Sequence, residues 1–193
     1  MNKLTKIIRV LTIPPIMALV LFITLYICVP NFFGSLLNLG LAIFFISVLP
    51  VLAYPLQGVI PGFKGKGREG QRNLAMIFSV AGYFLGCLTN FILKAPLTLW
   101  LVYLVYLVSG ICIFVFSKVV HFKASGHACG IMGPIAFLLY FGVYWAVGGI
   151  LVYLAAFWAS VKMKRHTVPQ FIGGAAIPVA ALFVLANVFS IIM

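Results

Sequence analysis

Three short polar stretches of this chain carry the residue types that could do chemistry. They span residues 64–72, 123–127 and 164–170, and almost everything between them is apolar. Together they hold most of the basic residues, two of the three histidines and the single acidic residue, Glu69. Lysine and arginine bind phosphate oxygens, and an imidazole can attack phosphorus or transfer a proton. The combination predicts a site that binds a phosphate group and attacks it.

The second stretch, which contains Ser125-Gly-His127, has the composition of an anion site at a helix start. We expect these residues to open a helix, whose free N–H groups and dipole favour an anion. Gly126 allows the backbone to approach an oxygen closely, Ser125 offers a hydroxyl, and Lys123 offers a charge. The alternative is a capped interfacial helix with a lysine that snorkels to the headgroups.

The third stretch places His166 and Gln170 four residues apart. If the last helix begins at or before His166, the two share a face and the amide can orient the imidazole. Pro169 suits the first turn of a helix, so the start is open. Arg165 can bind phosphate through two parallel hydrogen bonds. The alternative is a basic interfacial turn that precedes a span.

The first stretch carries Lys64, Lys66, Arg68, Glu69 and Arg72. Such a cation cluster beside a membrane can bind lipid headgroups or set the topology, without any part in catalysis. Glu69 can pair with Arg72 if the segment is helical, because the two are three residues apart. It could instead hold a catalytic histidine, and the sequence leaves both roles open.

The composition is that of an integral membrane protein. Of the 193 residues 65% are hydrophobic and 7% are charged, and the mean hydropathy is +1.25. The apolar runs are continuous, which favours helices over an outer-membrane barrel. At roughly 20 residues per span, the length predicts one all-α domain, residues 1–193, folded as a polytopic transmembrane helix bundle of six or seven spans. The net charge of +12 sits in short loops, so we expect membrane lipids and a phosphorylated lipid as partners and no nucleic acid.

We expect spans at about 9–29, 35–59, 73–93, 97–117, 129–146, 149–161 and 170–192. The stretch 129–160 is ambiguous, because a single helix of that length would reach about 48 Å and exceed a hydrocarbon core of about 30 Å. A hairpin that turns near Gly148-Gly149 would place the second and third polar stretches on one membrane face, as chemistry shared by the two histidines requires. Every Lys and Arg except Lys94 then lies on that face, which the positive-inside rule assigns to the cytoplasm.

The sequence indicates no metal site and no cofactor. The cysteines lie far apart, in or beside apolar runs, and fit the pattern of buried small hydrophobic residues; they are Cys28, Cys87, Cys112 and Cys129. One carboxylate in the whole chain gives a hard cation little to bind.

In their order, the three stretches resemble the motifs of the membrane-bound type-2 phosphatidic acid phosphatase superfamily, the lipid phosphate phosphatases. That family has a Lys/Arg motif, then Pro-Ser-Gly-His, then Ser-Arg followed by His-x-x-x-Asp. The resemblance covers about residues 60–170 and matches at 125–127 and at His166. Four features depart from the pattern: Ala124 replaces the proline, Gln170 the aspartate, and Ser160 the arginine six residues before the last histidine, and the first stretch ends in Arg72-Asn73 instead of Arg-Pro.

The resemblance implies a metal-independent phosphatase that works through a phosphohistidine. His166 would attack phosphorus, and His127 would protonate the leaving oxygen and then activate water. Gln170 or Glu69 would orient the imidazole. The residues implied to hold the phosphate are Lys66, Arg68, Arg72, Lys123, Ser125, Gly126 and Arg165. The implied substrate is a lipid phosphate or a prenyl (di)phosphate, in the cytoplasmic membrane of a prokaryote.

Two other functions compete with this one. The same scaffold could be catalytically weak or inactive and bind or transport a phosphorylated lipid. An unrelated transporter or channel is disfavoured, because such proteins usually carry ionisable groups within their spans and these spans have almost none. The exact lipid and the oligomeric state stay open.

Overall fold

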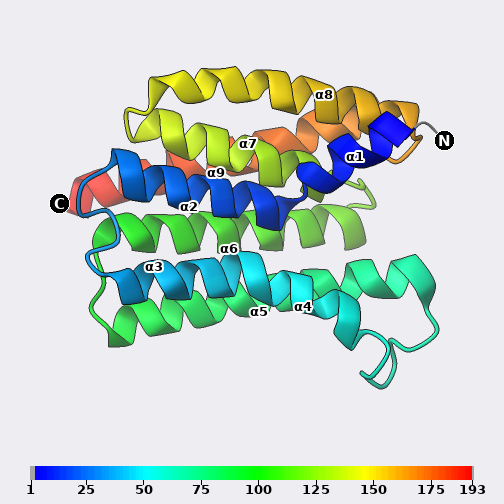
Figure 1. Ribbon diagram of the computed structural model, residues 1–193, viewed down its shortest axis with the longest axis horizontal. Coiled ribbons are helices and arrows are strands. Elements are labelled where there is room, and N and C mark those ends of the chain that lie inside the picture. Colours follow the sequence, from blue (N-terminus) through cyan, green and yellow to red (C-terminus); the bar gives the residue numbers. More distant parts are fainter. Residues whose placement is uncertain (1–2, 193) are drawn as a thin grey trace.

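The computed structural model describes residues 3–192, and this part of the chain is helical throughout, with no strand (Figure 1). The elements are α1 (Lys3–Leu11), α2 (Pro14–Cys28), α3 (Leu36–Ile43), the π-helical η1 (Phe44–Val48), α4 (Leu49–Leu56), α5 (Gly67–Ile92), α6 (Leu97–Lys118), α7 (Gly126–Tyr140), the 3₁₀-helical η2 (Tyr144–Gly148), α8 (Gly149–Lys162) and α9 (Val168–Ile192). The predicted all-α bundle is confirmed.

The bundle has the features of a multi-pass membrane protein. Among residues 3–192, five helical segments are long and apolar enough to cross a membrane, and a sixth is formed if the bent pair α1–α2 counts as one span. Large apolar side chains such as Ile27 and Phe183 are mostly exposed, as expected of a surface that faces lipid. Within the described residues the count reaches the lower end of the expected six or seven only if α1–α2 is taken as one span, because α7 is a shorter apolar helix.

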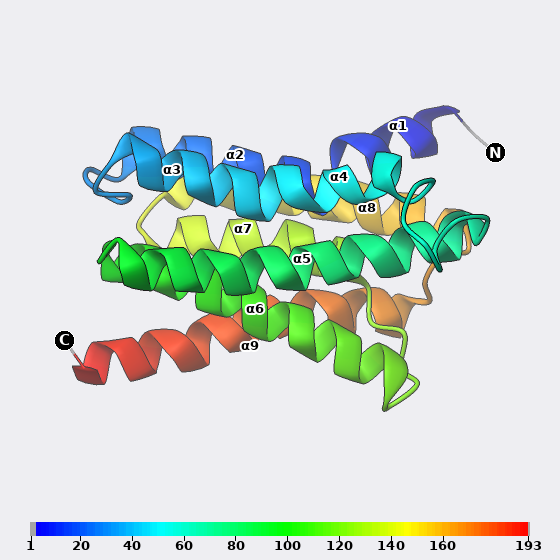
Figure 2. The same cartoon turned by 90° about the horizontal axis from the view of Figure 1, so that it is seen from below.

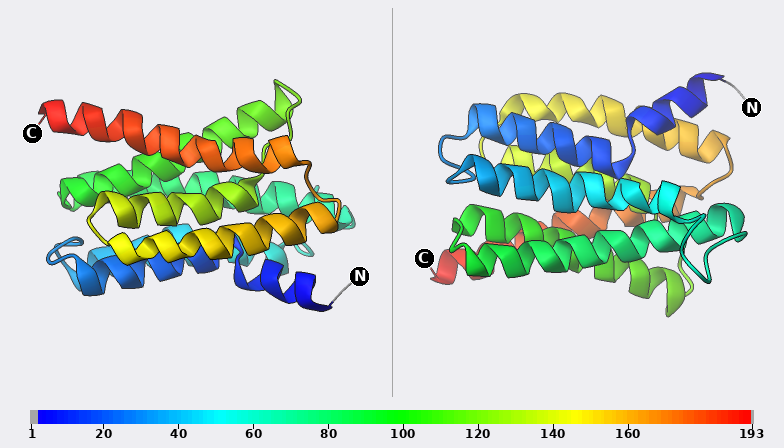
Figure 3. Two further views of the ribbon diagram at one scale, coloured as in Figure 1. Left: turned by 90° about the horizontal axis from the view of Figure 1, so that it is seen from above. Right: turned by 60° about the horizontal axis from the view of Figure 1, so that its bottom comes forward.

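The first predicted span, 9–29, is broken. Helices α1 and α2 meet at an angle of 48°. The break falls at Thr12 and Ile13, directly before Pro14-Pro15, which begin α2. Proline has no N–H and its ring clashes with the preceding turn, so the proline pair fits best in the first turn of α2 and favours a break before it. As a result α1 leaves the direction of α2 and runs obliquely beside the end of α8 (Figure 3).

The ambiguous stretch 129–160 forms the hairpin, but its turn lies elsewhere than expected. Helix α7 ends at Tyr140 and the chain reverses through Gly142, whose φ of +81° favours glycine. The expected turn at Gly148-Gly149 instead lies in the helical segment that leads into α8.

The hairpin brings the polar stretches to one end of the bundle. The α4–α5, α6–α7 and α8–α9 connections all lie at that end, together with the start of α1 (Figures 1 and 2). Lys94 lies in the α5–α6 connection at the opposite end. The shared face on which the predicted site depends is therefore present, while its assignment to the cytoplasm stays a prediction.

Helix α9 packs so closely on the start of α7 that it fixes the second polar stretch. The Ser125 N–H donates to the carbonyl of Gln170 at 2.9 Å. A side chain on Gly174 would collide with the Ser125 carbonyl, so only glycine permits this approach. Gly130 lies one turn after the start of α7, and it is similarly close to Pro14 of α2. These contacts set the position of the loop that carries Lys123 and His127.

Candidate active site

Both predicted catalytic histidines line one small polar cavity of about 110 Å³ at the common end of the bundle. Its walls come from α1, α5, the α6–α7 loop, α7, α8 and the α8–α9 loop. The lining residues are Arg9, Arg72, Lys123, His127, Ala156, Ser160, Arg165 and His166. No acidic residue is among them, so the cavity gathers positive charge without an internal counter-ion and favours an anionic ligand.

His166 is held in one tautomer by the backbone. Its Nδ1 lies 3.2 Å from the carbonyl oxygen of Lys123. A carbonyl can only accept, so Nδ1 carries the proton and donates it, and Nε2 is left with a free lone pair. Partial burial lowers the pKa of His166, and the hydrogen bond to the Lys123 carbonyl offsets part of that effect. The ring is therefore neutral and nucleophilic at lower pH than an ordinary histidine.

Gln170 was expected to orient His166, but its described hydrogen bond is made elsewhere. Helix α9 begins only at Val168, two residues after the histidine. From the first turn, Gln170 Oε1 accepts the Thr167 N–H at 3.1 Å and so caps the helix start. The Gln170 side chain still lies close enough to the ring to favour its protonated form. The main anchor of the imidazole is the Lys123 carbonyl, in the role expected of Gln170 or Glu69.

His127 is anchored by a residue that the sequence analysis did not single out. Its Nε2 lies 2.8 Å from Oγ1 of Thr12, at the bend between α1 and α2. The Thr12 hydroxyl also donates to the Ile8 carbonyl at 2.8 Å. A hydroxyl has one hydrogen, so its oxygen accepts from His127, and Nε2 carries a proton. This leaves Nδ1 as the second titrating position of the ring.

Ser125 and Gly126 take structural positions beside the pocket. Ser125 is the N-cap of α7, as expected, and its Oγ accepts the Ala128 N–H at 3.2 Å. The side chain is fully buried and does not line the polar pocket. The cap uses the oxygen only as an acceptor, but Ser125 lines neither cavity, so this structure does not bring its hydroxyl to the pocket. Gly126 lines a larger cavity that adjoins the pocket.

The first polar stretch contributes one residue to the pocket, Arg72. Helix α5 begins at Gly67, earlier than expected, and turns the neighbouring side chains away. Lys66, Arg68 and Glu69 are exposed and line neither cavity. Lys66 instead places its Nζ over the Phe63 ring, 5.8 Å from the centroid. These three positions fit contact with lipid headgroups or solvent better than contact with a ligand in the pocket.

Arg9 is the cation that sequence reasoning missed. It lies on α1 and lines the polar pocket together with Arg72 and Arg165. Lys3, Lys6 and Arg9 recur every three residues, which would place them on one face of a helix. That spacing was visible in the sequence, but it does not show that α1 lies against the pocket.

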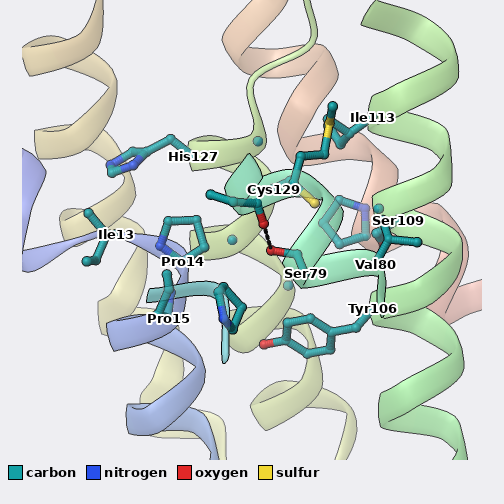
Figure 4. Close-up of a pocket in the computed structure, with 18 of the residues that line it drawn as sticks. Ile13, Pro14, Pro15, Ser79, Val80, Tyr106, Ser109, Ile113, His127 and Cys129 are labelled. Atoms are coloured by element: carbon teal, nitrogen blue, oxygen red, sulfur yellow. Dashed lines mark hydrogen bonds between the residues drawn. The ribbon is translucent and has the colours of Figure 1, made fainter. Parts of the chain in front are cut away.

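The larger cavity adjoins the polar pocket and lies between the helices (Figure 4). It has a volume of about 320 Å³ and shares Arg9, Arg72, His127 and His166 with the pocket. Most of the remaining walls are apolar; they include Ile13, Pro14, Ile46, Met76, Val80, Val105 and Phe137. A ligand whose charged group lay in the pocket could therefore place its apolar part in the larger cavity.

The chain matches no protein-family model, no curated protein and no solved structure. The resemblance to the lipid phosphate phosphatases therefore rests on the motifs. Among residues 3–192 there is no group of three or more His, Cys, Asp or Glu side chains that could hold a metal ion.

Proposed function

We propose that this protein is a membrane-embedded phosphatase that removes phosphate from a lipid phosphate through a phosphohistidine, as a divergent relative of the type-2 phosphatidic acid phosphatases. The observation that carries the proposal is the shared pocket: two histidines from distant parts of the chain meet there beside Arg9, Arg72, Lys123 and Arg165. Four cations with no acid in the wall suit a phosphate, and a nucleophile and a proton donor suit its hydrolysis.

The mechanism follows from the two fixed rings. His166 Nε2 attacks phosphorus, and the P–O bond to the lipid breaks as the N–P bond forms. His127, carrying a proton on each ring nitrogen, gives its Nδ1 proton to the leaving oxygen and keeps the Nε2 proton that it donates to Thr12. A water then attacks the phosphohistidine, giving its proton to His127 and freeing His166 with inorganic phosphate. The cations stabilise the charge that spreads over the equatorial oxygens in each transition state. No step in this scheme uses a metal ion.

The adjoining cavity supports an amphiphilic substrate. A phosphate between His127 and His166 would have its organic part in an apolar space bounded by transmembrane helices. Phosphatidate, phosphatidylglycerophosphate and polyprenyl mono- or diphosphates all have this form.

A second candidate is a protein of the same scaffold that binds or transports a phosphorylated lipid without hydrolysis. The observation that favours it is the lack of a carboxylate in the pocket wall. A backbone carbonyl orients His166 but stabilises the imidazolium less than a carboxylate would.

Phosphate release separates the two candidates. Purified protein should release inorganic phosphate from dioctanoyl phosphatidate without added metal, and His166→Ala should abolish release while lipid binding persists. His121→Ala is the matched control, because His121 is exposed and lines neither cavity. If wild type and His166→Ala were equally inactive on lipid and prenyl phosphates, the phosphatase proposal would fail.

We further propose that the protein resides in the cytoplasmic membrane of a prokaryote with the pocket on the cytoplasmic side, from the one-sided distribution of Lys and Arg. Single cysteines replacing Lys64 and Thr167 should react with an impermeant maleimide from one side. Native Cys28, exposed at the other end of the bundle, should react from the opposite side. Labelling of all three from one side would contradict the shared face.

A further inference from the structure

Two hydroxyl groups in the larger cavity lack the partners that a membrane interior normally demands. Tyr106 Oη and Ser109 Oγ, both on α6, are buried without a hydrogen-bond partner in the described part of the chain. Both residues line the cavity, and Ser109 is only 4% exposed. Ser109 lies close to the Cys129 thiol, which is at most a weak hydrogen-bonding partner for it (Figure 4).

This state differs from the usual behaviour of a serine in an apolar helix. Such a serine commonly donates to the carbonyl four residues earlier, as Ser79 does to Ala75 at 2.8 Å. The Ser79 bond is drawn in Figure 4, where Tyr106 also extends its hydroxyl into the cavity. A buried hydroxyl without a partner is costly in an apolar medium, and a ligand that brought acceptors to it would recover that cost.

The depth of the two hydroxyls indicates which atoms of a ligand they would meet. Ser109 lies beside Cys129, which is two residues along α7 from His127 and therefore about 3 Å further along the helix axis. Tyr106 lies three residues before Ser109 on α6, about 4.5 Å further from the polar pocket. The hydroxyls thus face the atoms that come directly after the phosphate, not the end of a long chain.

The candidate substrates differ at this point. A diacylglycerol phosphate has two ester carbonyls a few bonds beyond the phosphate, and both are acceptors. A prenyl phosphate has only hydrocarbon there and would leave both hydroxyls unpaired. A site built to hydrogen-bond a substrate group discriminates strongly against an analogue that lacks it.

We propose that the Tyr106 and Ser109 hydroxyls bind the ester carbonyls of a glycerolipid phosphate, and that they select such lipids over prenyl phosphates. The proposal rests on the proposed phosphate pocket, because the phosphate sets the depth at which the carbonyls lie. Tyr106 and Ser109 act as specificity determinants and take no part in the transfer of phosphate.

The test compares dioctanoyl phosphatidate with farnesyl phosphate on the purified full-length protein. Tyr106→Phe and Ser109→Ala should each raise KM for the phosphatidate roughly 2- to 12-fold, the range of one lost hydrogen bond, with little change for farnesyl phosphate. Tyr103→Phe is the matched control: Tyr103 is a buried tyrosine of the same helix that does not line the cavity. The diether analogue of the phosphatidate, which lacks both carbonyls, should be insensitive to all three substitutions.

Binding separates this inference from the phosphatase proposal. In a His166→Ala background, dioctanoyl phosphatidate should raise the Tm more than farnesyl phosphate does, and Tyr106→Phe should remove the difference. That result with an inactive wild type would retain the lipid selectivity and reject the phosphatase. Equal effects of Tyr106→Phe on both lipids, or none on either, would overturn the selectivity and leave the phosphatase proposal to its own test.

Discussion

Replacing Thr12 by valine tests whether the bend between α1 and α2 holds His127, the histidine that we propose as acid and base. Valine keeps the shape of threonine but removes the oxygen that lies 2.8 Å from His127 Nε2. Thr12 is 6% exposed, so water cannot readily replace the lost acceptor. A buried donor left without a partner costs about 1–3 kcal/mol. At a tenfold change for each 1.4 kcal/mol, this corresponds to roughly 5- to 150-fold in kcat if the loss falls on the oriented ring.

The assay is steady-state phosphate release from dioctanoyl phosphatidate, with Thr12→Ser as the matched control. Serine keeps the hydroxyl that accepts from His127 and donates to Ile8, so it should recover most of kcat. KM should change little in either variant, because the cations of the pocket are untouched. Wild-type kcat in Thr12→Val would refute the reasoning. Equal losses in both variants would refute it too, since they would point to the methyl group instead of the hydrogen bond.

Three further predictions follow from the same geometry. Arg72→Ala should lower kcat/KM roughly 10- to 150-fold, the range of a hydrogen bond to a charged group, whereas Arg68→Ala, outside the pocket, should change it less than about twofold; equal losses would place both in the site. Gly174→Ala should lower the free energy of unfolding by about 1–3 kcal/mol through its clash with Ser125, as measured by thermal melting. Gly148→Ala is the control and should leave the stability unchanged, because an added methyl group there meets no atom within 4 Å. A Gly174→Ala protein as stable as wild type would contradict the close packing. Burial lowers the pKa of His166, so the acid limb of the kcat/KM profile should lie below the ordinary pKa of 6.5, and a limb above 6.5 would contradict this expectation. As the pH falls, His166 is protonated in the unfolded chain before it is protonated in the folded protein. The contribution of the neutral ring to folding stability is therefore complete above pH 6.5 and is lost as the pH falls toward the folded pKa.

Much of the fold could be predicted because the membrane restricts the choices. Continuous apolar runs can only be helices when the backbone must satisfy its own hydrogen bonds. The length of 129–160 against the thickness of the bilayer favoured a hairpin, and the common end of the bundle followed from it. The position of the turn could not be predicted in this way, because a glycine pair at 148–149 is a stronger local turn signal than the single Gly142. The chain nevertheless turns at Gly142, which has a positive φ.

The site was partly predictable for a related reason. His127 and His166 stand out as polar residues in a hydrophobic chain, and both line the pocket. Their anchors did not stand out. Lys123 acts through its carbonyl, which every residue has, and Thr12 resembles any other threonine until the proline pair bends α1 across the site. Composition and residue spacing do not reveal contacts made by backbone atoms, or contacts between helices that are distant in the sequence.

The central claim is that His166 is the nucleophile of a phosphate-transfer reaction. It is tested most directly by quenching the purified protein in base during turnover of dioctanoyl phosphatidate labelled at phosphorus, then mapping the label by peptide mass spectrometry. The account predicts a base-stable, acid-labile phosphoryl group on His166 that is absent from His166→Ala. Phosphate release with no covalent label, or a label that persists in His166→Ala, would contradict it.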